Sequence, residues 1–299
     1  MQRTASGQQG PFHAIVAQPA GLQTVLAFAA AQFSDVVALQ LTSEGLRLQA
    51  VDSAQSAFLD AQFASTGSDS IFRSWVLAPP YLALHLHPKS LANLLAASNP
   101  AGTLLSQLSL AVGAQSDRLS VGVSSLGKHG VALRACYDVA LLSAEGQAEI
   151  VEVSAADFTF TAQLLCTLPA ILADAVGSLK SAGCQEVRLT LRPGSESGRR
   201  PSSVSFESCG PELPINCCIT LEEPSEGGKL ALAVDAACSA SFHFKWARFF
   251  ERLAALSKVS SSVLLQLGPE APLSVVCQLN GGGYCRLFLA PVVEDDRMS

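Results

Sequence analysis

Charged and aromatic residues are scarce in this sequence. Of its 299 residues only 15% are charged and 6% aromatic, whereas 49% are hydrophobic, and the formal net charge is −6 at pH 7. Such a chain can bury a large core, and its acidic balance argues against a surface that binds nucleic acid everywhere, although a local basic stripe is compatible with it. No uncharged apolar run reaches the ~18 residues of a transmembrane helix, so we expect no membrane partner.

The sequence also lacks the signatures of common catalytic and metal sites. Its nine cysteines include no Cys-x-x-Cys spacing, which favours reduced thiols in a cytosolic or nuclear protein. It contains no nucleophile elbow, phosphate-binding loop or dinucleotide fingerprint. His85 and His87 offer two imidazoles on one strand, but no third ligand is evident, so a metallohydrolase is the weakest interpretation. We therefore expect no catalytic residue, metal or cofactor.

The sequence does contain an internal repeat. A strand–helix–strand pattern that begins at Phe12 starts again at Phe158, about 150 residues later. This period is too long for a solenoid, whose repeats run ~20–50 residues, and it predicts two similar domains. We expect helices over residues 21–33, 89–97, 169–180 and 245–256, all on one face of antiparallel sheets, which is an α+β fold. We expect strands over residues 36–41, 46–51, 82–86, 108–112, 119–123, 187–191, 230–234, 263–267, 274–279 and 285–289.

The same pattern predicts the limits of the domains. Residues 1–11 have no apolar core of a secretory signal and are expected to form a disordered tail. The first domain should span residues 12–137 and the second residues 157–291, joined by a linker over residues 138–156. Residues 292–299 form an acidic C-terminal tail.

Several segments resemble the proliferating cell nuclear antigen family. Residues 46–55 contain its Asp-Ser pair at Asp52, residues 261–276 resemble its last hairpin with a Pro-Leu dipeptide, and residues 287–296 carry its Leu-Ala-Pro followed by an acidic end. The pair Phe249-Phe250 matches as well, and the resemblance extends in order from Phe12 to Asp296. It implies a DNA clamp fold in which three two-domain subunits close head to tail around duplex DNA, with the helices lining the hole.

The resemblance also implies the function. A clamp of this family has no catalytic chemistry; in the nucleus it is loaded by a clamp loader and tethers DNA polymerases and other proteins through their short helical motifs. We expect a homotrimeric sliding clamp that acts as a polymerase processivity factor in replication and repair. The alternative is one subunit of the heterotrimeric DNA-damage checkpoint clamp, and a third is a ring-derived interaction protein through which no DNA passes.

Basic residues are expected where helices face DNA, because phosphate contacts give binding that is independent of sequence and dependent on salt. Lys245, Arg248 and Arg252 fall on one face of the last helix, and Lys89, Lys180 and Lys258 are peripheral. The other helices are poor in lysine and arginine. DNA binding by one subunit should therefore be weak and non-specific.

Two further sites follow from the resemblance. The partner pocket should be formed by Val51, Ile150, Val151, Val153, Pro272, Phe288, Ala290 and Pro291. The subunit interface should pair edge strands at 118–123 and 204–209, because exposed strand edges are normally protected. Its expected residues are Arg118, Leu119, Val121, Val123, Val204 and Phe206.

Overall fold

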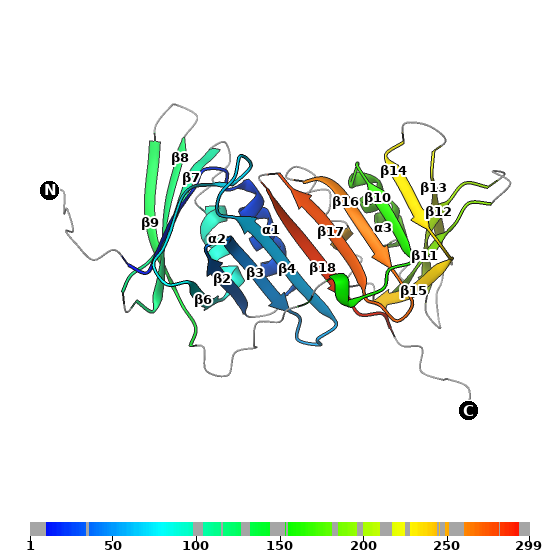
Figure 1. Ribbon diagram of the computed structural model, residues 1–299, viewed down its shortest axis with the longest axis horizontal. Helices are drawn as coiled ribbons and strands as arrows, with labels where there is room; N and C mark the ends of the chain where they lie inside the picture. Colours follow the sequence, from blue (N-terminus) through cyan, green and yellow to red (C-terminus); the bar gives the residue numbers. More distant parts are fainter. Residues whose placement is uncertain are drawn as a thin grey trace. The chain divides into compact units, whose positions relative to one another are not determined.

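The computed structural model describes residues 10–33, 36–97, 104–114, 116–126, 132–143, 153, 155–180, 185–195, 200–209, 217–224, 228–243, 245, 249–250, 260–280 and 282–292 (Figure 1). Its elements form an α+β fold of antiparallel sheets and few helices. None of the helices in this part of the chain is long and apolar enough to cross a membrane. All cysteines within it are free thiols.

In the first half of the sequence, the described residues form nine strands and two helices. They are β1 (Phe12–Val16), α1 (Ala20–Gln32), β2 (Val37–Thr42), β3 (Gly45–Val51), β4 (Ala57–Ala64), β5 (Phe72–Leu77), β6 (Tyr81–Leu86), α2 (Pro88–Ala97), β7 (Leu104–Val112), β8 (Arg118–Leu126) and β9 (Ala132–Ala140). The expected helices at 21–33 and 89–97 are thus confirmed to within one residue. β9 runs three residues into the segment expected to be linker.

The second half follows the same order. After the short 3-10 helix η1 (Ala155–Asp157) come β10 (Ala162–Cys166), α3 (Ala170–Lys180), β11 (Glu186–Arg192), β12 (Ser203–Cys209), β13 (Cys218–Glu222), β14 (Leu230–Val234), β15 (Cys238–His243), β16 (Ser260–Leu267), β17 (Leu273–Leu279) and β18 (Gly283–Leu289). α3 confirms the helix expected at 169–180. Of the helix expected at 245–256, Lys245, Phe249 and Phe250 are helical, and the other positions lie outside the described residues.

Strand pairing repeats between the two halves. In the first, β1 pairs with β5 and β7, and β2 pairs with β3 and β6. In the second, β10 pairs with β14 and β16, and β11 pairs with β12 and β15. The strand orders β5-β1-β7-β8-β9 and β4-β3-β2-β6 recur as β14-β10-β16-β17-β18 and β13-β12-β11-β15. The repeat in the sequence is therefore a repeat of the whole pairing scheme.

The chain divides into two compact units. Unit 1 comprises residues 1–50, 60–150 and 280–283, and unit 2 comprises residues 51–59, 151–279 and 284–299. The division between residues 150 and 151 falls within the segment expected to be linker. Each unit includes a short stretch from the other half of the sequence, so the turn after β3 belongs to unit 2.

Helices cover the apolar faces of the sheets. In unit 1, α1 buries Leu22, Val25, Leu26 and Phe28 and packs on α2. In unit 2, α3 packs on β12 and β13 and buries Leu172, Val176 and Leu179. Burying a side chain of this size stabilises the fold by about 1.5–3 kcal/mol, so the buried residues of these helices supply much of the hydrophobic stabilisation of the core.

The two strands expected at the subunit interface are not edge strands. β8 lies between β7 and β9, and β12 lies between β11 and β13. Their expected contact residues are core residues, each at most 3% exposed: Leu119, Val121, Val123, Val204 and Phe206. Only Arg118 is exposed. Alternating apolar residues mark a strand with one buried face, and they do not distinguish an inner strand from an edge strand.

Next to these inner strands, β9 and β13 are edge strands; the opposite edges of the two sheets are β5 and β15. Within the described part of the chain, β9 pairs only with β8 and β13 only with β12. On β9, Leu133 is 51% exposed and Tyr137 is 38% exposed. Both lie on the core-facing side of the sheet, because Tyr137 stands opposite the buried Val121 and Leu133 opposite Ser125. β9 therefore exposes apolar side chains at the edge of its sheet.

Leu119 and Leu133 make a matched pair for testing this topology. Leu119→Asp should lower the free energy of unfolding by at least about 3 kcal/mol, because it buries an unpaired carboxylate. Leu133→Asp should change it by less than about 1 kcal/mol, because the side chain is half exposed. Urea unfolding followed by circular dichroism measures both. Equal destabilisation by the two variants would contradict the assignment of β9 as the edge.

Candidate functional site

A buried carboxylate holds the turn that follows β3. Asp52 is 6% exposed, and its Oδ1 accepts the backbone N–H groups of Ser56 at 2.6 Å and Ala57 at 2.7 Å. Its Oδ2 accepts the hydroxyl of Ser56 at 3.0 Å. Gln55 adopts a φ of 53°, in the left-handed region that few side chains enter outside turns. The carboxylate thus fixes the point at which β4 begins.

Lys245 completes this arrangement. Its Nζ donates to Asp52 Oδ2 at 3.3 Å, while half of the lysine side chain remains exposed. Burial raises the pKa of Asp52, but the donors Ala57, Ser56 and Lys245 outweigh burial, so the net pKa is lowered. Lys245, which was expected to face DNA, therefore has a structural partner within unit 2.

An aromatic cluster includes Phe58, which lies in β4 directly after this turn. Phe288 of β18 stacks on Phe58 with ring centroids 6.2 Å apart and contacts Phe158 at 5.7 Å. Phe160 packs on Phe158 at 6.1 Å. The guanidinium of Arg286 lies 5.7 Å from the centre of the Phe288 ring, within cation–π distance. Phe288 is only 4% exposed as a result.

The C-terminal segment passes beside the same turn. The backbone N–H of Ala290 donates to the carbonyl of Ser56 at 2.9 Å, and that of Val292 donates to the carbonyl of Ser241 at 2.7 Å. Pro291 and Val292 border an open hollow of about 550 Å³. Its other walls are Arg188, Cys238, Ser239, Ala240, Ser241, Gly268, Pro269, Glu270 and Ala271. Volumes of this order suit a small ligand or a few peptide side chains.

Unit 2 contains all described members of the expected partner pocket. Ala290 is exposed and bonded to the Asp52 turn, Pro291 borders the open hollow, and Phe288 is buried beneath two other rings. Val51, Val153 and Pro272 are half-buried. Ile150 and Val151 lie outside the described residues. Sequence reasoning missed Phe58 and Phe158, whose apolar character alone does not reveal that they meet Phe288.

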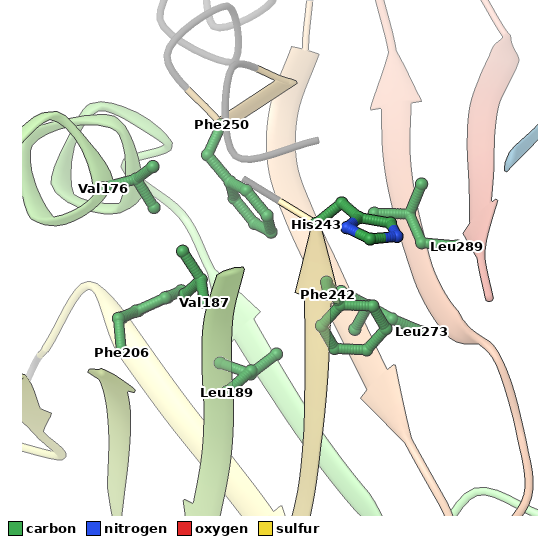
Figure 2. A pocket seen from close by; sticks show the side chains of 9 residues that line it. All are labelled: Val176, Val187, Leu189, Phe206, Phe242, His243, Phe250, Leu273 and Leu289. Atoms are coloured by element: carbon green, nitrogen blue, oxygen red, sulfur yellow. The ribbon is translucent and has the colours of Figure 1, made fainter. Parts of the chain in front are cut away.

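The hollow in the core of unit 2 is a different feature. Figure 2 shows it between α3 and the strands behind it, lined by Val176, Val187, Leu189, Phe206, Phe242, His243, Phe250, Leu273 and Leu289. Its volume of about 20 Å³ is enough for roughly one water molecule. Its walls are almost wholly apolar, so we assign it to the packing of the core.

Among the helices expected to face DNA, α1, α2 and α3 carry almost no charge. α1 contains no charged residue, and its exposed positions include Ala20, Ala27 and Ala31. α2 exposes Lys89, and α3 exposes Asp174. α3 ends at Lys180, while Arg248, Arg252 and Lys258 lie outside the described residues. The described helix faces therefore offer little attraction for phosphate.

Unit 1 carries a buried polar network that the sequence did not reveal. Arg47 Nε donates to Asp60 Oδ1 at 2.6 Å, and the Gln49 amide donates to the same oxygen at 3.4 Å. Gln40 donates in turn to Gln49 at 3.3 Å. Asp60 is 1% exposed, so this ion pair is shielded from solvent on the carboxylate side. Residues two apart on a strand point to one face, which is why a polar row alternates with the apolar core here.

His85 and His87 do not form the metal pair considered above. β6 ends at Leu86, so His87 lies beyond the strand and is exposed, whereas His85 is 9% exposed. Burial lowers the pKa of His85. Within the described residues no group of three or more histidine, cysteine, aspartate or glutamate side chains is placed to hold a metal ion.

Comparisons with known proteins bear on the fold. No protein-family model and no curated protein sequence matches the chain. A solved structure described as proliferating cellular nuclear antigen from Entamoeba histolytica matches with a TM-score of 0.73 at 17% sequence identity, covering 95% of this chain and 99% of that one. The chain thus has a fold like that of this clamp protein over nearly its whole length.

The Asp52 turn generates a stability prediction. Asp52→Ala should lower the free energy of unfolding by about 2–4 kcal/mol, because it leaves two buried N–H groups without their acceptor. Asp52→Asn, which keeps an acceptor oxygen, should lower it by less. Ser53→Ala, on an exposed neighbour in the same turn, is the matched control and should change it by less than about 0.5 kcal/mol.

The lowered pKa of Asp52 adds a pH dependence of known sign. Stability from this carboxylate is fully present above the unfolded pKa near 4 and is lost as pH falls through the lower folded pKa. The difference in stability between the unmodified protein and Asp52→Asn should therefore shrink below about pH 4. Urea unfolding between pH 3 and pH 7 measures it, and a difference that stays constant would contradict the assignment.

Proposed function

We propose that this chain is a subunit of a DNA sliding clamp that tethers replication and repair enzymes to duplex DNA in the nucleus. The observation that supports this most is the doubled pairing scheme, combined with the likeness to a clamp structure over 95% of the chain. The subunit acts as a scaffold without catalytic chemistry. Its partners are DNA, a clamp loader, and polymerases and other proteins that bring short helical motifs.

The ring closes through β9 of one subunit and β13 of the next. Each ends its sheet, and an edge strand with exposed apolar side chains invites pairing with another chain. Two different edges on one chain give a head-to-tail contact, which forms a ring when the rotation closes. This replaces the contact expected between residues 118–123 and 204–209.

Charge and side-chain pattern favour one register for this contact. If the strands run antiparallel with Arg134 opposite Glu222, Tyr137 stands opposite Ile219 and Ala135 opposite Leu221. Arg134 and Glu222 are both exposed, whereas Ile219 and Leu221 are half-buried beside the core. An opposite-charge pair then lies on one face of the joined sheet and apolar pairs lie on the other, and each such pair stabilises the contact by about 0.2–1 kcal/mol.

An assembly experiment tests this register. The unmodified chain should elute as a trimer in size exclusion with light scattering, and Arg134→Glu should shift it towards monomer. Adding Glu222→Arg to the same chain should restore the trimer, because the opposite charges return in reversed order. Arg73→Glu, exposed on β5, is the control. Failure of the double variant to recover would contradict the register.

The second candidate is a subunit of the heterotrimeric DNA-damage checkpoint clamp. The uncharged faces of α1, α2 and α3 favour it, because neighbours in a mixed ring can supply the positive charge that this subunit lacks. A monomer in light scattering, together with capture of two different clamp subunits, would support this candidate over the homotrimer. Monomer alone, without such partners, would favour an interaction protein.

DNA binding distinguishes a clamp from an interaction protein. The double variant Arg248→Ala with Arg252→Ala should flatten the salt dependence of duplex binding, since each phosphate contact contributes a slope of about −0.9. Lys245 is left in place because it bonds to Asp52. The control, Arg73→Ala with Arg192→Ala, removes two exposed arginines from strands and should leave the slope unchanged.

Retention of the protein on closed circular DNA is the complementary measurement. Protein loaded on closed circular DNA should stay bound in high salt and be released once the circle is cut. Release at the same rate from both forms would contradict encirclement of DNA.

A further inference from the structure

The outer side of β18 carries an aromatic site that is already filled. Cys285, Leu287 and Leu289 point into the core and are at most 1% exposed, so the alternate residues Tyr284, Arg286 and Phe288 share the opposite face. Arg286 lies over both rings, 5.3 Å from the centre of Tyr284 and 5.7 Å from that of Phe288. A ring on the outer face of a strand is normally at least partly exposed, yet Phe288 is 4% exposed.

Two phenylalanines cover Phe288, and they are held differently. Phe58 lies within β4, directly after the turn that Asp52 fixes, and stacks on Phe288 at an interplanar angle of 17°. Phe158 follows η1 and precedes β10, so it belongs to no strand. Its ring meets Phe288 at 47°, within the geometry of a favourable aromatic pair.

We propose that Phe158 occupies, within the same chain, the position that the aromatic anchor of a partner peptide takes when it binds. This inference rests on the proposed function, in which short motifs bind this face of unit 2. The site formed by Phe58, Arg286 and Phe288 binds an aromatic ring in the free protein, and that ring belongs to Phe158. A partner with an aromatic pair on a helical turn must displace it.

Phe158 is the ring that can leave. The backbone of Phe58 is held in place, because it follows directly after the turn in which Asp52 accepts from Ser56 and Ala57 and lies within β4. The backbone ladder of β10 begins beyond Phe158, at Ala162, so the backbone at Phe158 can shift with its ring without breaking strand pairing. Phe160, which packs on Phe158 at 6.1 Å, offers an alternative contact for the displaced ring.

Self-occupation reduces the apparent affinity for a partner by the fraction of molecules in which the site is open. An aromatic pair of this kind shifts such an equilibrium by roughly tenfold. Phe158→Ala should therefore strengthen peptide binding by about tenfold, whereas loss of a true wall of the pocket would weaken it. Stronger peptide binding would therefore indicate that Phe158 occupies the site, and weaker binding would indicate that it is part of the pocket wall.

The test uses the full-length protein and a fluorescein-labelled synthetic peptide that carries two adjacent aromatic residues on a short helical turn. Fluorescence anisotropy should show tighter binding to Phe158→Ala, binding to Phe160→Ala within about threefold of the unmodified protein, and loss of binding to Phe288→Ala. Unchanged or weaker binding to Phe158→Ala would overturn the proposal.

A measurement without peptide separates this inference from the proposed function. The dye 1-anilinonaphthalene-8-sulfonate should fluoresce more with Phe158→Ala than with Phe160→Ala, because only the first variant uncovers Phe288. Equal dye signals would overturn self-occupation. A raised dye signal without peptide binding in any variant would support self-occupation and overturn partner binding at this face.

Discussion

Each half of this chain depends on one constraint: the apolar faces of its strands must be covered, and helices provide the cover. α1 shows how this shapes the molecule, because it buries Leu22, Val25, Leu26 and Phe28 and leaves mainly alanine and uncharged polar residues outside. A helix can meet this requirement with any solvent-facing residues, since burial acts only on its inner side. The outer faces are therefore free to carry charge for a ligand. In this chain the described helices carry very little, which separates the fold of a clamp from the electrostatics of DNA binding.

The candidate binding face of unit 2 depends on the buried carboxylate of Asp52. The carboxylate of Asp52 accepts hydrogen bonds from Ser56, Ala57 and Lys245, and the turn it stabilises presents Ser56 to the backbone of Ala290. One buried acid thereby joins the start of β4, the segment at Ala290 and Lys245. A charged acceptor with several donors contributes more than a neutral one, because its hydrogen bonds are stronger in a shielded environment. The geometry of the candidate binding face follows from this turn.

The sequence predicted the elements whose burial follows a clear period. β8 and β11 lie where periodicity placed them, because each alternates buried apolar residues with small or polar ones along the strand. β9 and β13 were not predicted: β9 is exposed on both faces over most of its length, and β13 alternates half-buried and exposed residues over only five positions, with no fully buried residue. The sequence also could not show which strands are edges, because the alternating pattern around Leu119 is the same in an inner strand as in an edge strand. At the candidate site the resemblance supplied Phe288 and Ala290, but the contact of Phe158 with Phe288 joins segments 130 positions apart, and single-sequence patterns contain no information on such pairs.

The open edges and the filled aromatic site have a common physical basis. A free strand edge and an exposed aromatic ring both favour association, and both bind unsuitable partners as readily as suitable ones. On β9 the apolar Leu133 and Tyr137 alternate with polar residues such as Arg134, which restrict the partners that can pair in register. At the aromatic site the chain's own Phe158 covers Phe288. Selectivity requires a cost against the wrong partner as well as contacts with the right one. Under the proposed function, the charged residues of β9 and the ring of Phe158 each provide such a cost.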